Sequence, residues 1–207
     1  MSKAPFFAEI IESSLQNWIA QSWQWDAFPA YGSLVAIEQK KRTLFAVVYS
    51  IQTGSQDPVR TPFAYQKTEE ELLAQQPQIF AFLRTTFSCL PLGYQENNKL
   101  FYLLAPEPAK MHAFVRPMSY EEKKRFFSTS SFLPLVFGNN AQVGLLEELL
   151  LAMLADIARV GLLYPDYVEQ FMQDFSLLTG NDYRRLKLFL QRAQPILENH
   201  IQTEMGL

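Results

Sequence analysis

The pattern of hydrophobic and polar positions changes once along this chain. Up to about residue 117, short apolar runs alternate with polar turns at intervals of roughly ten residues, which favours a small antiparallel barrel or sandwich. From Ser119 onward, apolar residues recur every three or four positions, which indicates amphipathic helices. The pattern predicts an α+β fold with a small antiparallel β-barrel and a short helical insertion over residues 1–117, followed by a C-terminal helical bundle over residues 118–207.

The first half contains the predicted strands. A polar turn at residues 38–42 joins two apolar runs, which predicts a hairpin. The second of these runs is almost wholly apolar, so we expect a strand that is buried on both faces, as in a closed sheet. Turn-forming residues predict a loop at residues 53–58 and a turn at residues 93–98. The predicted strands are residues 8–13, 17–22, 32–37, 43–49, 87–92, 100–103 and 111–115.

Helix starts and ends are marked by specific residue types. Thr68 with Glu71, and Ser119 with Glu122, have the spacing of a capping box, and Pro77 predicts the start of a second short helix in the insertion. Three further helices carry apolar stripes that must be buried against each other or against the barrel. These stripes are Leu146, Leu149, Leu150, Met153 and Ile157, then Val168, Phe171, Met172, Phe175 and Leu178, then Tyr183, Leu186, Phe189, Leu190 and Ala193. Gly161, Pro165 and Gly180 stand at their predicted ends.

Composition narrows the class of protein. Hydrophobic residues make up 48% of the chain and charged residues 19%, which is typical of a globular protein with a large core. The net charge of −3 argues against a dedicated nucleic-acid binder. Charged residues interrupt the most apolar segment, residues 145–163, so it predicts a core helix and not a membrane span. Glu9 interrupts the apolar run near the N-terminus, and we expect a cytoplasmic protein.

The motifs of common active sites are missing from the sequence. None of the eight glycines precedes a lysine, and no Gly-x-Gly occurs, which excludes a P-loop and a dinucleotide fingerprint. Cys89, His112 and His200 are the only thiol and imidazole side chains, and they are far apart in sequence. A zinc site or a Cys89–His112 dyad is one interpretation, and a buried thiol with a structural histidine in the last strand is the simpler one. We expect no catalytic residue, no metal, no cofactor and no enzymatic activity.

Charged clusters provide the remaining candidates. Residues 69–71 are acidic and lie in the first turn of a capped helix, where the helix dipole favours negative charge. Glu147 and Glu148 are adjacent on a helix, so their carboxylates point about 100° apart and do not converge on one substrate. Basic residues gather at positions 40–42, in a predicted turn, and on the last helix at Arg184, Arg185, Lys187 and Arg192, where they face an acidic partner or water.

A third basic group lies directly before two phenylalanines. Lys123, Lys124 and Arg125 precede Phe126 and Phe127, a combination found in proteins that bind single-stranded nucleic acid. The alternative is an amphipathic helix with its phenylalanines inside and its lysines outside. These three basic residues are the candidate partner-binding residues of the chain.

Several strings between residues 8 and 115 resemble the HAS-barrel, the barrel domain of HerA-type translocases and of catalytic-ring subunits of rotary ATP synthases. They are residues 32–35, 44–48 and 57–62, then Gly93-Tyr94, and Pro106-Glu107-Pro108 with Val115. In those families the barrel assembles or guides a neighbouring ATPase core. Here a helical segment follows the barrel and no ATPase motif occurs, so the resemblance implies no ATPase activity.

Three functions follow from these observations as hypotheses. The first is a non-catalytic adaptor or assembly module whose partner is another protein. The second is a nucleic-acid-associated accessory factor related to the translocase branch of the barrel family. The third is an enzyme of unrecognised type, which a deep pocket lined by titratable groups would indicate.

Overall fold

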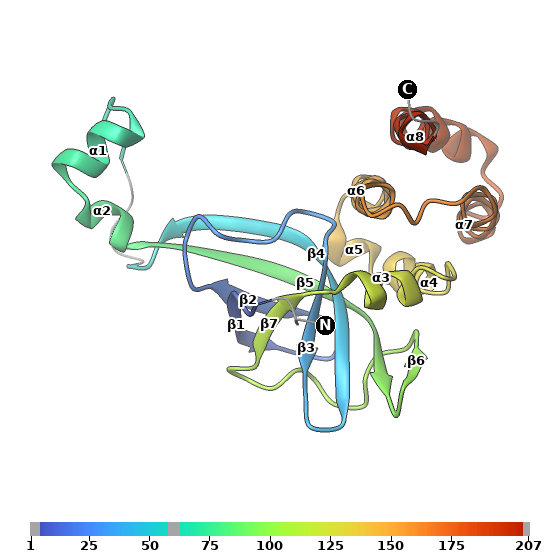
Figure 1. The fold of residues 1–207 in the computed structure, drawn as a ribbon, viewed down its shortest axis with the longest axis horizontal. Coiled ribbons are helices and arrows are strands. Elements are labelled where there is room, and N and C mark those ends of the chain that lie inside the picture. The colour runs from blue at the N-terminus through green and yellow to red at the C-terminus, as the bar shows by residue number, and fades with distance from the viewer. Residues whose placement is uncertain (1–4, 58–62, 205–207) are drawn as a thin grey trace.

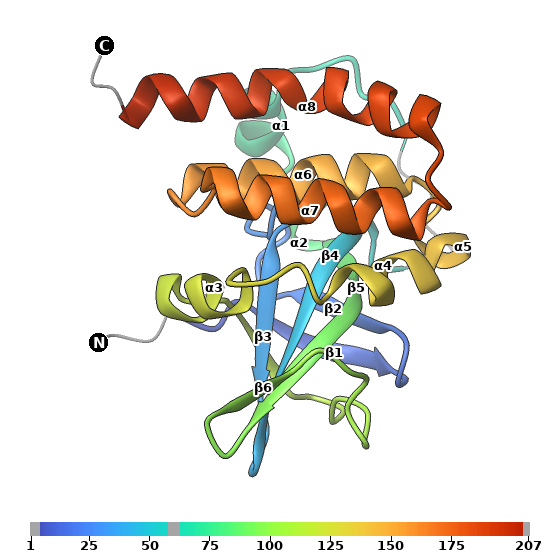
Figure 2. The same ribbon diagram turned by 90° about the vertical axis from the view of Figure 1, so that its right-hand side faces the viewer.

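The computed structural model describes residues 5–57 and 63–204, and it contains a closed six-stranded antiparallel barrel (Figures 1 and 2). Around the ring the strands follow the order β2-β1-β7-β3-β4-β5, and β2 pairs with β5 to close it. A further short strand, β6, extends β5 outside the ring. The bounds are β1 (Ala8–Ser13), β2 (Trp18–Ser22), β3 (Leu34–Glu38), β4 (Arg42–Ser55), β5 (Leu83–Glu96), β6 (Lys99–Phe101) and β7 (Phe114–Pro117).

β3, residues 44–48 of β4 and residues 89–94 of β5 are buried on both faces. Alternate residues point to opposite sides of a strand, so β3 sends Val35 and Ile37 into the barrel and Leu34 and Ala36 outward. In β4, residues 44, 46 and 48 point inward, and residues 45 and 47 point outward. All of these side chains are at most 3% exposed, which confirms the two-sided burial predicted from the apolar run.

C-terminal helices cover the outer face of these three strands (Figure 2). Phe45 on β4 and Leu92 on β5 belong to one continuous core with helix residues such as Leu133, Met153 and Phe175. The helices are α3 (Tyr120–Phe126), α4 (Leu133–Gly138), α5 (Asn140–Val143), α6 (Leu146–Arg159), α7 (Pro165–Leu178) and α8 (Tyr183–Glu204). The fold is therefore α+β with an N-terminal antiparallel barrel and C-terminal helices, and the larger core crosses the boundary between them.

Gly32, two residues before β3, lies close to α6. Its φ of +77° is in the left-handed region, and a Cβ atom there would stand 2.4 Å from the Cβ of Ala152. Any side chain at this position would push the helix away from the barrel. Glycine is therefore required both for its positive φ and for the space that a side chain would need.

Between β4 and β5 lie two short helices, α1 (Glu69–Gln75) and α2 (Gln78–Ala81). They form an arm that projects from the barrel, away from the C-terminal helices (Figure 1). Thr68 and Glu71 form the capping box that the sequence predicts, and neither helix has a buried residue. At the base of the arm, the ring of Phe80 lies 5.6 Å from that of Trp25.

Long-range pairing overrides several local turn signals. β4 continues through Thr53 and Gly54, and β5 continues through Gly93, because the two strands pair along their whole length. The predicted loop at residues 53–55 and turn at residues 93–96 are therefore wrong, and the turn is confined to Asn97 and Asn98, whose φ angles are positive. Residue 58, at the end of the predicted loop, lies outside the described residues.

Two other expectations for local structure are wrong. The last strand begins at Phe114 and not at Met111, because the chain turns at residues 110–113 before it joins the sheet. Helices α4 and α5 have no counterpart among the predicted elements, since each is too short to display a full apolar stripe. The Ser119–Glu122 capping box and the helix ends at Gly161 and Gly180 are confirmed.

Replacement of Met153 by aspartate should unfold the helical part of the chain. Met153 is completely buried on α6, and an unpaired charge in such a core costs several kcal/mol. Thermal unfolding followed by circular dichroism should show a large decrease in melting temperature for Met153→Asp. Leu188→Asp, at a residue that is 54% exposed on α8, should melt close to the parent protein. Equal melting of parent and Met153→Asp would contradict the assigned core.

A fragment of residues 1–117 should aggregate. Without the helices, it would expose the outward side chains of β3, β4 and β5, including Phe45, Val47 and Leu92. We expect size-exclusion chromatography of this fragment to yield aggregates, and polar substitutions at these three outward positions to recover soluble material. An unmodified fragment that is monomeric and melts cooperatively would show that the barrel folds independently of the helices.

Candidate partner-binding surface

The three basic residues of segment 123–125 have different environments. Lys123 Nζ lies 2.5 Å from Asp156 Oδ2, and the two side chains are 12% and 8% exposed, so this ion pair joins α3 to α6 inside the protein. Arg125 donates hydrogen bonds to Asn98 Oδ1 at 3.0 Å and to Gln95 Oε1 at 3.3 Å, on the β5–β6 hairpin. Lys124 is exposed and makes no ion pair with any described residue. The three side chains thus do not form one basic patch.

The phenylalanines that follow this segment point into the core. Phe126 is completely buried, and Phe127 is 4% exposed. The ring of Phe126 lies 6.0 Å from that of Phe45 on the outer face of the barrel. The amphipathic-helix alternative is therefore confirmed for these two side chains, which are not available for stacking on bases.

Arg116 forms a buried junction with two carboxylates. Its side chain is 4% exposed, and its two terminal nitrogens donate to the two carboxylate oxygens of Glu122, each at 2.7 Å. Its Nε donates to Glu38 Oε1 at 3.1 Å. Glu122 also accepts the backbone N–H of Ser119 at 2.8 Å as part of the capping box. Arg116 thus connects β7, β3 and the start of α3, a role that no motif in the sequence announces.

The ionisation of this junction follows from its hydrogen bonds. Burial alone would raise the pKa of Glu122, but the hydrogen bonds from Arg116 and Ser119 outweigh it, and the pKa is lowered. The hydrogen bond to Glu122 raises the pKa of Arg116 despite its burial. Both groups are charged at neutral pH, and each charge is compensated by the other.

Cys89 and His112 lie in different environments and do not form a dyad. Cys89 is fully buried inside the barrel, in register with Trp18 and Val48, and burial raises the pKa of its thiol. His112 is on the outside, in a turn with a φ of 63°, and its side chain is 75% exposed. The expectation of a histidine in a strand is therefore wrong. The side chain of His200 lies outside the described residues.

Ion pairs account for the acidic pair on α6 and for part of the basic group on α8. Glu147 pairs with Arg185 at 2.5 Å, and Glu148 pairs with Arg192, which connects α6 to α8. Arg184 and Lys187 remain exposed on α8. Among the residues that the structure describes, no group of three or more histidine, cysteine, aspartate and glutamate side chains could hold a metal ion.

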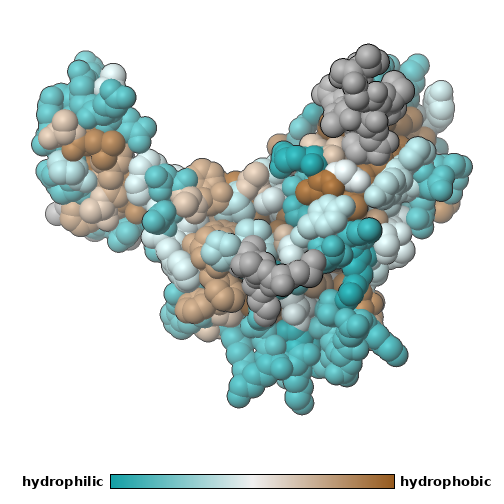
Figure 3. Space-filling view, in the orientation of Figure 1, coloured by the Kyte–Doolittle hydropathy of each residue, from teal (hydrophilic) through white to brown (hydrophobic). Residues whose placement is uncertain are grey.

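An exposed cluster of three aromatic side chains was not predicted. The ring of Phe114 lies 5.6 Å from that of Phe6 and 5.4 Å from that of Trp23, and the three residues are 48%, 38% and 54% exposed. We call these three residues the aromatic cluster. They come from the ends of β7 and β2 and from the residues before β1, on the side of the barrel that the helices leave uncovered. Hydrophobic surface covers β1 and β2 in this region (Figure 3).

Backbone hydrogen bonds hold the aromatic cluster together. Phe7 N donates to Val115 O at 3.1 Å, and Trp23 N donates to Phe7 O at 3.0 Å. These bonds align the three segments that carry the rings. Beside the cluster, His112 Nδ1 lies 2.5 Å from Glu9 Oε1, and Glu9 is paired in register with Phe114.

No protein-family model and no curated protein matches the sequence of this chain. The closed antiparallel barrel is compatible with a small barrel domain. Of the strings that resemble the HAS-barrel, residues 32–35 and 44–48 enter or form β3 and β4, whereas 58–62 lie outside the described residues. No helix in the described ranges is both long enough and apolar enough to cross a bilayer.

Replacement of Arg116 by methionine should destabilise the protein by about 2–4 kcal/mol, because it removes the buried guanidinium that forms two hydrogen bonds with the carboxylate of Glu122. The matched control is Arg42→Met. Arg42 Nε lies 3.0 Å from Glu96 Oε1, but both side chains are more than a fifth exposed, at 22% and 26%, so we expect a loss below about 1 kcal/mol. Urea unfolding of both variants measures the difference. Equal losses would show that the Arg116 junction contributes no more than a surface pair.

Proposed function

We propose that this chain is a non-catalytic adaptor or assembly module that acts through contacts with another protein. The observation that supports this proposal is the aromatic cluster of Phe6, Trp23 and Phe114. Exposed aromatic residues are enriched at the centres of protein interfaces, where they supply large contact areas at a low cost in side-chain entropy. Single exposed apolar residues are common on any surface, but three neighbouring rings form a patch.

The cluster suits a protein partner because its shape is set before binding. Its three chain segments are joined by backbone hydrogen bonds, so binding orders little additional backbone. The side chain of Trp23 is 54% exposed and offers an apolar ring with a hydrogen-bond donor at its edge. A partner that covers these rings with apolar groups and accepts a hydrogen bond from the indole would match this surface.

The charges beside the cluster favour protein over nucleic acid. Glu9 lies on β1 in register with Phe114. A carboxylate next to the rings repels a phosphate backbone, whereas a lysine or arginine on a protein partner would be attracted to it. The nucleic-acid alternative has less support, since Lys123 is paired with Asp156 and Phe126 and Phe127 are buried.

We further propose that the barrel is a HAS-barrel standing without an ATPase core and that the C-terminal helices form a bundle beside it. The helices cover β3, β4 and β5 and leave the β1–β2–β7 side open. In this arrangement the helices stabilise the barrel, and the open side holds the partner. The cytoplasm is the compartment we propose for this activity, in accord with a single reduced cysteine, Cys89.

The experiment that tests the adaptor proposal is affinity purification of the tagged full chain from its native cells, with and without nuclease. We expect one stoichiometric protein partner that survives nuclease. The variants Trp23→Ala and Phe114→Ala should each weaken its recovery about tenfold or more, because central aromatic residues carry much of the binding energy. The matched controls Leu103→Ala and Leu145→Ala remove exposed side chains elsewhere, which are 60% and 67% exposed, and should retain it.

Each other outcome has a distinct meaning. Loss of all partners after nuclease treatment would favour the nucleic-acid alternative. A partner that is retained by the Trp23 and Phe114 variants would move the contact away from the aromatic cluster. A chain recovered alone would contradict the adaptor proposal.

A further inference from the structure

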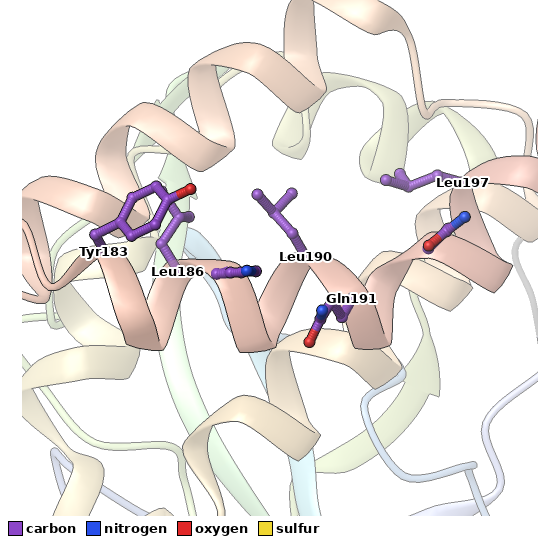
Figure 4. A pocket seen from close by; sticks show the side chains of 7 residues that line it. Tyr183, Leu186, Leu190, Gln191 and Leu197 are labelled. Atoms are coloured by element: carbon purple, nitrogen blue, oxygen red, sulfur yellow. The ribbon is translucent and has the colours of Figure 1, made fainter.

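One flank of α8 is an unoccupied apolar groove. α8 contacts the rest of the protein through Phe189 and Ala193, which are at most 1% exposed, and through the partly buried Leu186, Ile196 and Leu197. Its ion pairs to α6 lie on the flank that carries Arg185 and Arg192. On another flank is a groove of about 350 Å³. Its apolar lining consists of Tyr183, Leu186, Leu190 and Leu197, and Lys187, Gln191 and Gln194 complete it (Figure 4).

The spacing of the apolar residues fits a second helix. Tyr183, Leu190 and Leu197 are seven residues apart, which is the repeat by which one helix presents a seam to another. The seam spans about 21 Å along the axis. Tyr183 is 75% exposed and Leu190 is 36% exposed, so the described part of the chain leaves a substantial area of this seam in contact with solvent.

The charges along the seam are distributed unevenly. Arg184 and Lys187 lie at its N-terminal end and Glu198 at its C-terminal end, and all three are exposed. Within the described residues, none of them forms an ion pair, and Glu198 accepts a hydrogen bond from Gln194 at 2.6 Å. A partner helix that complements this flank must therefore be acidic at one end and basic at the other.

A second copy of α8 in the opposite direction has this charge distribution. If the two-fold axis passes beside Leu190, Tyr183 faces Leu197 of the second copy, and Arg184 comes within two helical positions of Glu198 of the second copy, about 3 Å along the axis. The same arrangement separates the two Lys187 positions by about 9 Å along the axis. A parallel arrangement would instead place Lys187 against Lys187 and Glu198 against Glu198, which is unfavourable.

We propose that this protein forms a two-fold symmetric dimer through antiparallel packing of α8 against α8 of a second copy. Leu190 lies at the centre of the interface, with Tyr183 and Leu197 on either side and Arg184–Glu198 ion pairs at both ends. The contact is isologous, so it closes after two copies and leaves no free seam.

Sedimentation velocity of the full chain over a range of micromolar concentrations tests the dimer. We expect reversible dimerisation by the parent protein and a monomer for Leu190→Glu. Loss of one central residue weakens binding about thirty-fold. The two-fold axis places this substitution in the interface twice, so the two effects multiply and the dissociation constant should rise about a thousand-fold. Leu188→Glu makes the same chemical change two residues away on the same helix, outside the groove, and should remain dimeric.

Charge reversal distinguishes the antiparallel arrangement from any other dimer and leaves the apolar core unchanged. Glu198→Arg should weaken the dimer about tenfold, because it faces Arg184 of the second copy, and the added substitution Arg184→Glu should restore it. Circular dichroism confirms that each variant is folded. A monomeric parent protein, or a dimer that responds to neither Leu190→Glu nor the charge reversals, would overturn the proposal.

Discussion

The two-sided burial of β3, β4 and β5 is the constraint on which the rest of this structure depends. A strand with apolar residues on one face can lie between a core and solvent, but these strands carry apolar residues on both. The inner face is satisfied when β2 pairs with β5 and the barrel closes. The outer face, which includes Phe45, Val47 and Leu92, requires a second layer, and the C-terminal helices provide it.

Polar contacts determine how this second layer is seated. Arg116 joins β7 and β3 to the first turn of α3 through Glu38 and Glu122. Lys123, the residue after Glu122, joins α3 to Asp156 on α6. Burying charges in this way adds little net stability, but each pair has one geometry, whereas apolar contacts allow many. The pairs therefore select the orientation of α3 and α6 on the barrel. Gly32 permits the close contact with Ala152 that this orientation produces.

Local patterns predicted most elements because local physical chemistry determines them. The capping box at Ser119 and Glu122 depends on residues three positions apart, and the two-sided burial of β4 is evident in its apolar run. Features that depend on distant pairing were not predictable. Gly93 has the character of a turn residue, yet it lies within β5 because β4 pairs with it.

The same distinction applies to the candidate surface. Phe6, Trp23 and Phe114 are as much as 108 residues apart in sequence, and the pairing of β1 with both β7 and β2 brings their rings together. Lys123 belongs to a basic segment followed by two phenylalanines, a pattern also found in nucleic-acid-binding segments. The neighbouring sequence does not show whether this lysine is exposed to solvent or paired with Asp156. The buried carboxylate of Asp156, 33 residues away in the sequence, makes Lys123 part of an internal ion pair.

The core of the protein lies between the aromatic cluster and the groove on α8. α8 lies beyond α6 and α7, whereas β1 and β2 lie on the barrel side (Figure 1). A contact at one surface therefore leaves the other free. In a two-fold dimer through α8, each copy would keep its aromatic cluster exposed, so the assembly would present two identical sites. Two linked sites bind a partner that has two copies of its own epitope far more tightly than one site does, provided that both can be engaged at once. An adaptor with modest affinity at each aromatic cluster would gain selectivity for assembled partners over single ones by this means.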